Sequence, residues 1–166
     1  MTKKRWISLL VENEIGVLAR IAGLFSAKSY NLNSLTVGPT EDATISRMTI
    51  SLISDAQTFE QIKKQLNRSV EVIKVIDFTD MAIHMKELMF IKVNNCTGED
   101  MTKLTYMRDV FNAKMIDYDA TVALFECVQT EELNNNFIKL LQSSFPNRIE
   151  VIRGGSVAID ALKYRM

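Results

Sequence analysis

The hydrophobic and polar residues of this chain predict four strands and two helices in its first half. Apolar runs typical of strands occupy residues 6–11, 32–37, 45–53 and 70–76. Apolar residues spaced three and four apart, as on one face of a helix, occupy residues 17–28 and 59–66. A helix-start signal, Asp55 with Thr58, precedes the second helix. The predicted order is therefore strand, helix, strand, strand, helix, strand.

The second half repeats this order more faintly. Its strand-like runs are residues 88–93, 115–118, 122–128 and 149–152, the last ending before a Gly-Gly pair. Polar turns that begin at Thr97 and Thr130 are typical of helix N-termini. The inner face of the last helix is expected to carry Leu133, Phe137, Leu140 and Leu141.

The repeated order predicts an α+β chain of two consecutive ferredoxin-like βαββαβ domains. Each domain is expected to be an antiparallel sheet with both helices on one face. We place the domains at residues 1–78 and 87–166, with a linker at 79–86. In this topology the first strand is central and the second lies at an edge, where unpaired backbone groups favour pairing with another chain. Residues 32–37 are thus a predicted dimer seam, and Asn31 is expected near both the partner and the turn that follows the first strand.

That turn, residues 13–18, is the candidate ligand site. It leads from a strand into a helix, whose N-terminus offers free N–H groups and a partial positive charge to an anion. The amides of Asn13 and Asn31 can bind either end of an amino acid, and Ile15, Val17 and Leu32 can form an apolar wall. A glycine that only permits a tight turn is the alternative explanation of Gly16. The candidate effector-binding residues are Asn13, Glu14, Ile15, Gly16, Val17, Leu18, Asn31 and Leu32.

Composition excludes several classes of protein. The 166 residues contain 20 basic and 20 acidic side chains, so no net positive charge favours nucleic acid. No apolar stretch reaches the 18 residues of a membrane helix, and the apolar run after the basic N-terminus is too short for a signal peptide. Cys96 and Cys127 lie in apolar strand-like runs and indicate buried free thiols of a reducing compartment. We therefore expect a cytoplasmic protein.

Catalytic and metal-binding signals are absent from the sequence. The single histidine, His84, has no nucleophile at a recognisable spacing, and neither cysteine has the spacing of a zinc site. We predict no catalytic residue, no metal ligand and no cofactor in this chain. Arg47 leaves two alternatives open: a clamp for a carboxylate, or a structural role on an exposed strand face or in a salt bridge across the sheet.

Three segments of the first half resemble a known family. The sequence NEIGVLARIAGLF at residues 13–25, with NLNSLTVGPTED at 31–42 and SRMTI at 46–50, is similar to the ACT domain of the regulatory (small) subunit of acetolactate synthase. The resemblance implies two ACT-like domains without an active site. It implies a catalytic large subunit as partner, which carries thiamine diphosphate, FAD and Mg and condenses pyruvate. The small subunit is then expected to activate that partner and to confer feedback inhibition on branched-chain amino acid biosynthesis.

In that family the effector, usually valine, lies between two ACT domains of a homodimer. The residues that match its binding positions are Asn13, Gly16 and Asn31. An interaction module that activates the large subunit without sensing an effector remains the alternative. A stand-alone small-molecule enzyme is a third possibility, against which the missing nucleophile, base and metal ligands count.

Overall fold

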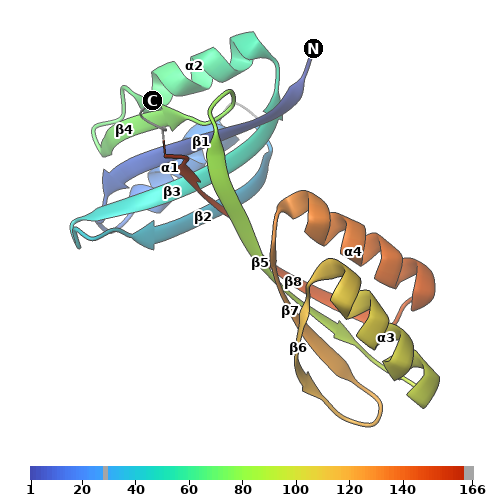
Figure 1. Cartoon of the computed structure of the whole chain (residues 1–166). Helices are drawn as coiled ribbons and strands as arrows, with labels where there is room; N and C mark the ends of the chain where they lie inside the picture. Colours follow the sequence, from blue (N-terminus) through green and yellow to red (C-terminus); the bar gives the residue numbers. More distant parts are fainter. Residues whose placement is uncertain (28–29, 163–166) are drawn as a thin grey trace. The chain divides into compact units, whose positions relative to one another are not determined.

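The computed structural model describes residues 1–27 and 30–162. The chain forms two compact units. One contains the described residues up to His84 together with residues 157–162, and the other contains Met85–Ser156. Each unit contains a four-stranded sheet with two helices (Figure 1). The predicted α+β fold with two βαββαβ units is confirmed.

The first unit follows the predicted element order. Its elements are β1 (Lys3–Glu12), α1 (Val17–Ser26), β2 (Leu32–Pro39), β3 (Ile45–Ser54), α2 (Ala56–Leu66) and β4 (Val72–Asp77). The sheet order is β2-β3-β1-β4, so β1 is central and β2 lies at an edge, as predicted. The end of the helix predicted over residues 17–28 includes Lys28, which lies outside the described residues.

One side of the first sheet carries the core of this unit. Alternate residues of β1 and β3 point to the same side and pack against three residues from each helix. This core contains Ile7, Leu9, Val11, Met48, Ile50 and Leu52 of the strands and Val17, Ile21, Phe25, Phe59, Ile62 and Leu66 of the helices. Asp55 begins α2 as predicted, because its Oδ1 accepts a hydrogen bond from the Thr58 N–H at 2.8 Å.

The second unit has the same architecture. Its elements are β5 (Ile83–Val93), α3 (Gly98–Phe111), β6 (Lys114–Tyr118), β7 (Ala123–Gln129), α4 (Glu131–Ser144) and β8 (Ile149–Asp160), in the sheet order β6-β7-β5-β8. β5 already begins within residues 79–86, the segment predicted as a linker. None of the helices in the described parts of the chain combines the length and apolar character needed to cross a membrane.

The closing strand is much longer than predicted. β8 continues through Gly154 and Gly155 to Asp160, so the prediction that it stops at residue 152 is wrong. Gly155 has a φ of 79°, a left-handed conformation that glycine adopts without strain inside a strand. The chain then returns to the first unit, where the Ala161 N–H donates to the carbonyl of Ala82 at 2.9 Å.

A buried ion pair determines which side of α4 faces the sheet. Glu87 on β5 is 4% exposed, and its two carboxylate oxygens accept hydrogen bonds from Arg153 at 2.9 and 2.6 Å. The buried amide of Asn134 donates to the same carboxylate at 2.9 Å. A buried charge needs such partners. The prediction that Leu133 and Leu140 face inward is therefore wrong, since Asn134 faces the sheet and both leucines are exposed.

A capping box starts α3, as the sequence predicted. The Asp100 N–H donates to Thr97 Oγ1 at 3.2 Å, and the Thr97 N–H donates to Asp100 Oδ2 at 2.9 Å. Arg148 Nη2 donates to Asp100 Oδ2 at 2.7 Å. This contact with Arg148 is the largest of the interactions that lower the pKa of Asp100 to about 2.

The low pKa of Asp100 makes the stability of the second unit dependent on pH. Because the pKa of Asp100 is lowered on folding, its ion pair stabilises the fold fully above about pH 4 and loses this effect as the pH falls toward 2. We expect Asp100→Asn to be less stable than the wild type at pH 7, with a difference that closes at low pH. Urea unfolding at several pH values measures this difference.

Asp80→Asn is the matched control for this prediction. Asp80 pairs with Lys3 at 3.1 Å, but its side chain is 86% exposed, so the substitution is expected to change stability little at any pH. A difference between Asp100→Asn and the wild type that stayed constant from pH 7 to pH 2 would contradict the role of the Asp100 carboxylate.

Candidate functional site

The turn between β1 and α1 has the geometry of an anion site. Gly16 is the N-cap of α1 with a φ of 87° and a ψ of −9°, a left-handed conformation that side chains of most residues disfavour. The first hydrogen bond within the helix is from the Arg20 N–H to the Gly16 carbonyl, at 3.0 Å. The N–H groups of Leu18 and Ala19 precede that bond and lie in the turn that carries the positive end of the helix dipole.

The N–H of Val17 is used within the turn itself. It donates to the carbonyl of Glu14 at 3.3 Å. The side chain of Val17 is 2% exposed and belongs to the core, so the prediction that it lines the apolar wall of the site is wrong. Ile15, at 102% exposure, and Leu18, at 43%, are the apolar side chains that the turn presents outward.

Asn13 is held in place by the neighbouring loop. Its N–H donates to the Thr44 carbonyl at 2.7 Å, and its Nδ2 donates to the Ala43 carbonyl at 2.9 Å. The loop is ordered in turn by Asp42, whose Oδ1 accepts from the Thr44 N–H at 2.9 Å and from the Thr44 hydroxyl at 2.6 Å. These bonds from Thr44 lower the pKa of Asp42. Since the amide donor of Asn13 is engaged, its Oδ1 is the atom suited to a ligand, as an acceptor for an ammonium group.

Arg20 is a component of the turn that the reasoning from the sequence did not single out. Its Nη1 lies 3.3 Å from the position that a Cβ on Gly16 would occupy. Its Nε pairs with Glu71 Oε1 at 2.5 Å. A guanidinium donor therefore stands beside the helix N-terminus, with its charge balanced by Glu71. The signal for it was available, because Arg20 lies four residues after Gly16 within the motif at residues 13–25.

Asn31 does not lie near this turn within one chain. Leu32, at the start of β2, is opposite Leu52, which in turn is opposite Arg5 near the start of β1. Asn13 follows Glu12, at the other end of β1. The seven steps from Arg5 to Glu12 along β1 span about 23 Å at roughly 3.3 Å per residue. The prediction that Asn31 stands near the turn of its own chain is thus wrong.

The remaining candidates lack the surroundings of a reactive site. Cys96 and Cys127 are buried and free, as predicted, and burial raises the pKa of the Cys127 thiol to about 11. Burial also raises the pKa of Cys96, which opposes thiolate formation. His84 is exposed. Within the described residues, no three side chains of His, Cys, Asp or Glu gather as a metal ion would require.

Arg47 lies on the face of the sheet away from helix α1. It lies opposite Leu10 and Gly38 in the sheet. Its Nε is buried without a hydrogen-bond partner among the described residues. Arg47 is next to Met48, a core residue, so it points to the sheet face away from the helices. It is therefore not placed to clamp a ligand at the N-terminus of α1.

Comparison with family models matches both halves of the chain. Residues 7–74 match the model described as an AHAS small subunit-like ACT domain. Residues 86–161 match the model described as the small subunit of acetolactate synthase. The two matched segments correspond to the two βαββαβ units.

Individual relatives agree with the family models over nearly the whole chain. The acetolactate synthase small subunit of Haemophilus influenzae is 35% identical over 157 residues, 95% of each chain. The isozyme 3 small subunit of Escherichia coli is 34% identical over 157 residues, again 95% of each chain. The crystal structure of the acetolactate synthase small subunit from Thermotoga maritima superposes with a TM-score of 0.86, at 31% identity, covering 97% of this chain and 99% of that one.

Proposed function

This chain belongs to the family of acetolactate synthase small subunits, which are regulatory rather than catalytic, and we propose that it senses a branched-chain amino acid. Valine is the first candidate effector. As a small subunit it associates with the acetolactate synthase large subunit. Its proposed role is to activate that subunit in the cytoplasm and to inhibit it when the effector is bound. The cofactors thiamine diphosphate, FAD and Mg then belong to the large subunit.

The effector site is proposed to be built from two copies of residues 1–78. The observation that carries this proposal is the distance of about 23 Å between the two halves of the site within one chain. β2 lies at the edge of its sheet, so two copies can pair their β2 strands antiparallel about a two-fold axis. Such pairing sets the Asn31 end of one β2 beside the Pro39 end of the other.

The Pro39 end of β2 is the end at which the turn lies. Pro39 is opposite Ser46, and Ser46 is opposite Val11 near the end of β1. Asn31 from the second copy would thus approach Asn13 and Gly16 of the first. In this arrangement the helix N-terminus and Arg20 attract the effector carboxylate, and Asn13 Oδ1 accepts from its ammonium. Ile15, Leu18 and the second copy's Leu32 are available to its aliphatic side chain.

Complementation between two defective variants tests this shared site. We expect Gly16→Asp and Asn31→Ala each to lose valine binding, measured by isothermal calorimetry, while remaining dimers. A mixed dimer contains one site with both changes and one site with neither. With free subunit exchange half of the dimers are mixed, so about a quarter of the wild-type binding sites should return.

Two results would contradict these proposals, and they differ. If both single variants lose binding and mixing restores none of it, the site does not span two chains as proposed. If the wild-type chain binds none of valine, leucine and isoleucine, alone or with its large subunit, the chain does not sense these amino acids. Activation of the large subunit without any effector response would then favour the simpler interaction module.

A further inference from the structure

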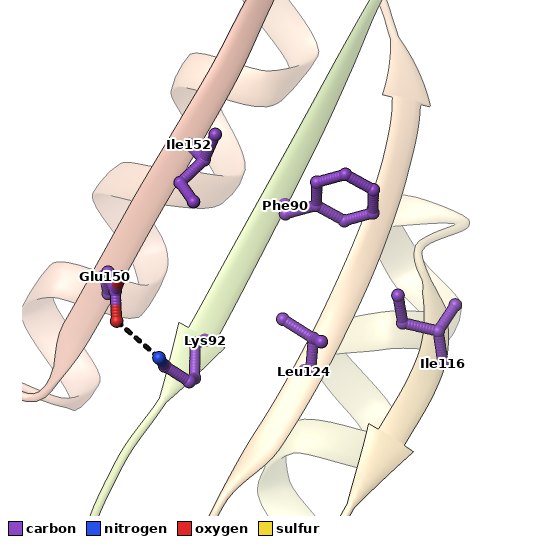
Figure 2. Close-up of a pocket in the computed structure, with 6 residues that line it drawn as sticks. All are labelled: Phe90, Lys92, Ile116, Leu124, Glu150 and Ile152. Carbon is purple, nitrogen blue, oxygen red and sulfur yellow. Dashed lines mark ion pairs between the residues drawn. The ribbon is translucent and has the colours of Figure 1, made fainter.

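The second unit leaves one face of its sheet without helices. Its core residues, among them Met89, Ile91 and Phe125, point toward α3 and α4. The alternate residues of the same strands point the other way. Figure 2 shows six of them on the side of the sheet away from the helices. We call this surface the open face of the second sheet, with the residues Leu88, Phe90, Lys92, Lys114, Ile116, Leu124, Glu126, Val128, Glu150 and Ile152.

The open face is hollow and largely apolar. Six of its residues line a depression of about 350 Å³: Phe90, Lys92, Ile116, Leu124, Glu150 and Ile152. Ile116 is 40% exposed and Ile152 is 61% exposed, although isoleucine strongly favours burial. Leu88 and Val128 extend the apolar area along β5 and β7, at 43% and 49% exposure.

The helix-free faces of the two sheets differ in exposure. The first unit has the same topology, and on this face Trp6, Leu10 and Ile76 alternate with small polar residues that are buried. Ser8 stands opposite Thr49 on this face, and the hydroxyls of Ser34 and Ser51 are 2.8 Å apart. A contiguous exposed apolar surface in one of two units with the same fold indicates a binding site for another protein.

The charges on the open face fit a partner that is itself uncharged. Lys92 Nζ and Glu150 Oε2 form an ion pair of 2.6 Å at one end of the depression (Figure 2). Glu126, opposite Phe90, and Lys114, opposite Glu126, add one charge of each sign to the same face. Because these charges balance, the face carries no net charge that would attract nucleic acid or an acidic peptide.

The size of the face argues against self-association as its main use. The sheet has four strands, which at about 4.8 Å spacing and roughly six residues each cover about 400 Å². A stable interface generally needs about 800 Å² from each partner. The face alone is therefore too small to hold two copies of the chain together, and it fits as one part of a wider interface.

We propose that the open face of the second sheet contacts an apolar surface of the acetolactate synthase large subunit. The proposal rests on the association with that subunit and deepens the proposed function by giving the partner a contact surface. The family model that matches residues 86–161 is described as the small subunit of acetolactate synthase. The large subunit is the protein with which a small subunit associates, and an exposed apolar face with balanced charges suits an apolar surface of that partner.

Charge substitutions on the face test the proposal in the complete complex. We expect Ile116→Lys and Ile152→Lys to raise the concentration needed for half-maximal activation of the large subunit at least about tenfold, because each introduces an unpaired charge into an apolar contact. Valine binding by the small subunit alone should stay unchanged, so a failure of this proposal is distinguishable from a failure of effector sensing. Both residues are exposed, and circular dichroism with urea unfolding confirms that the variants fold.

Val110→Lys is the matched control, because Val110 is 80% exposed on α3 in the same unit. It should activate normally. Wild-type activation by both face variants would overturn the proposal, as would an effect of Val110→Lys equal to theirs. A loss of self-association by the small subunit alone, with activation intact, would assign the face to a second copy instead.

Salt gives a further test on the wild-type complex. The affinity of the small subunit for the large subunit should change less than about threefold between 50 and 500 mM salt, since apolar contacts are not screened.

Discussion

Gly16→Asp is expected to abolish effector binding, with a loss of affinity of at least about 100-fold. The introduced carboxylate would stand where the effector carboxylate is proposed to bind. Two like charges 4 Å apart repel by about 4 kcal/mol near a protein surface. The new carboxylate would also form an ion pair with Arg20, whose Nη1 is 3.3 Å from the position of a Cβ on residue 16. Titration with valine by calorimetry measures the loss, while the complex with the large subunit should remain active and ignore valine.

Two controls separate charge from strain. Gly16→Asn has the same shape and tolerates the φ of 87° equally well, but it brings no charge, so it should lose much less affinity. Gly98→Asp adds a carboxylate at the start of α3, where a Cβ meets nothing within 4 Å, and it should bind valine normally. Normal binding by Gly16→Asp, or an equal loss in Gly16→Asn, would contradict an anion site at this turn.

Arg153→Met is expected to lower the free energy of unfolding by about 3 kcal/mol, the largest stability effect that we predict. The substitution leaves the carboxylate of Glu87, which is 4% exposed, without its cation. Removing one partner of a buried pair costs about 3–5 kcal/mol, and the hydrogen bond from Asn134 limits this to the lower end. Urea unfolding measures the change.

Further variants test whether the buried charge of Glu87 causes the loss of stability. Adding Glu87→Gln to Arg153→Met replaces the buried carboxylate with a neutral amide and keeps an acceptor for Asn134, so the double variant should recover part of the lost stability. Lys103→Met breaks an exposed pair with Glu99 and should cost less than about 0.5 kcal/mol. If Lys103→Met cost as much as Arg153→Met, the buried setting of Glu87 would not be the cause.

The parts of the fold that local chemistry determines were predictable from the sequence. The alternation of Met48, Ile50 and Leu52 with polar residues identified the core face of β3. The starts of α2 and α3 followed from Asp55 and Thr97, whose caps involve only residues three positions away. The turn at Gly16 belongs to the same class, because a strand, a glycine and a helix follow one another directly.

Features that depend on distant residues were not predictable in the same way. Asn134 faces the sheet because it binds Glu87, which is 47 residues earlier in the chain. The spacing of apolar residues within α4 gives no sign of the contact between Asn134 and Glu87. β8 was predicted to end before the glycine pair, because glycines usually break a strand. Here Gly155 lets the strand continue with a left-handed residue.

The position of Asn31 shows the limit of reasoning from motifs. Asn31 and Gly16 lie in neighbouring motifs of the sequence, yet α1 has 10 residues and carries the chain back along the sheet by about 15 Å. The two residues therefore end at opposite ends of β1. The order of the strands could be predicted from the sequence. Only the register of the strand pairs established that the start of β2 lies level with the start of β1.

The separation of Gly16 from Asn31 also links effector affinity to the concentration of the protein. If a complete effector site exists only in the dimer, diluting the chain below the dissociation constant of the dimer also removes effector sites, because the dimers separate into monomers. The effector must then strengthen dimerisation by the same factor by which dimerisation strengthens effector binding. A cell that makes little of this subunit would respond less to the same amount of amino acid, so the level of expression itself would set the threshold of feedback.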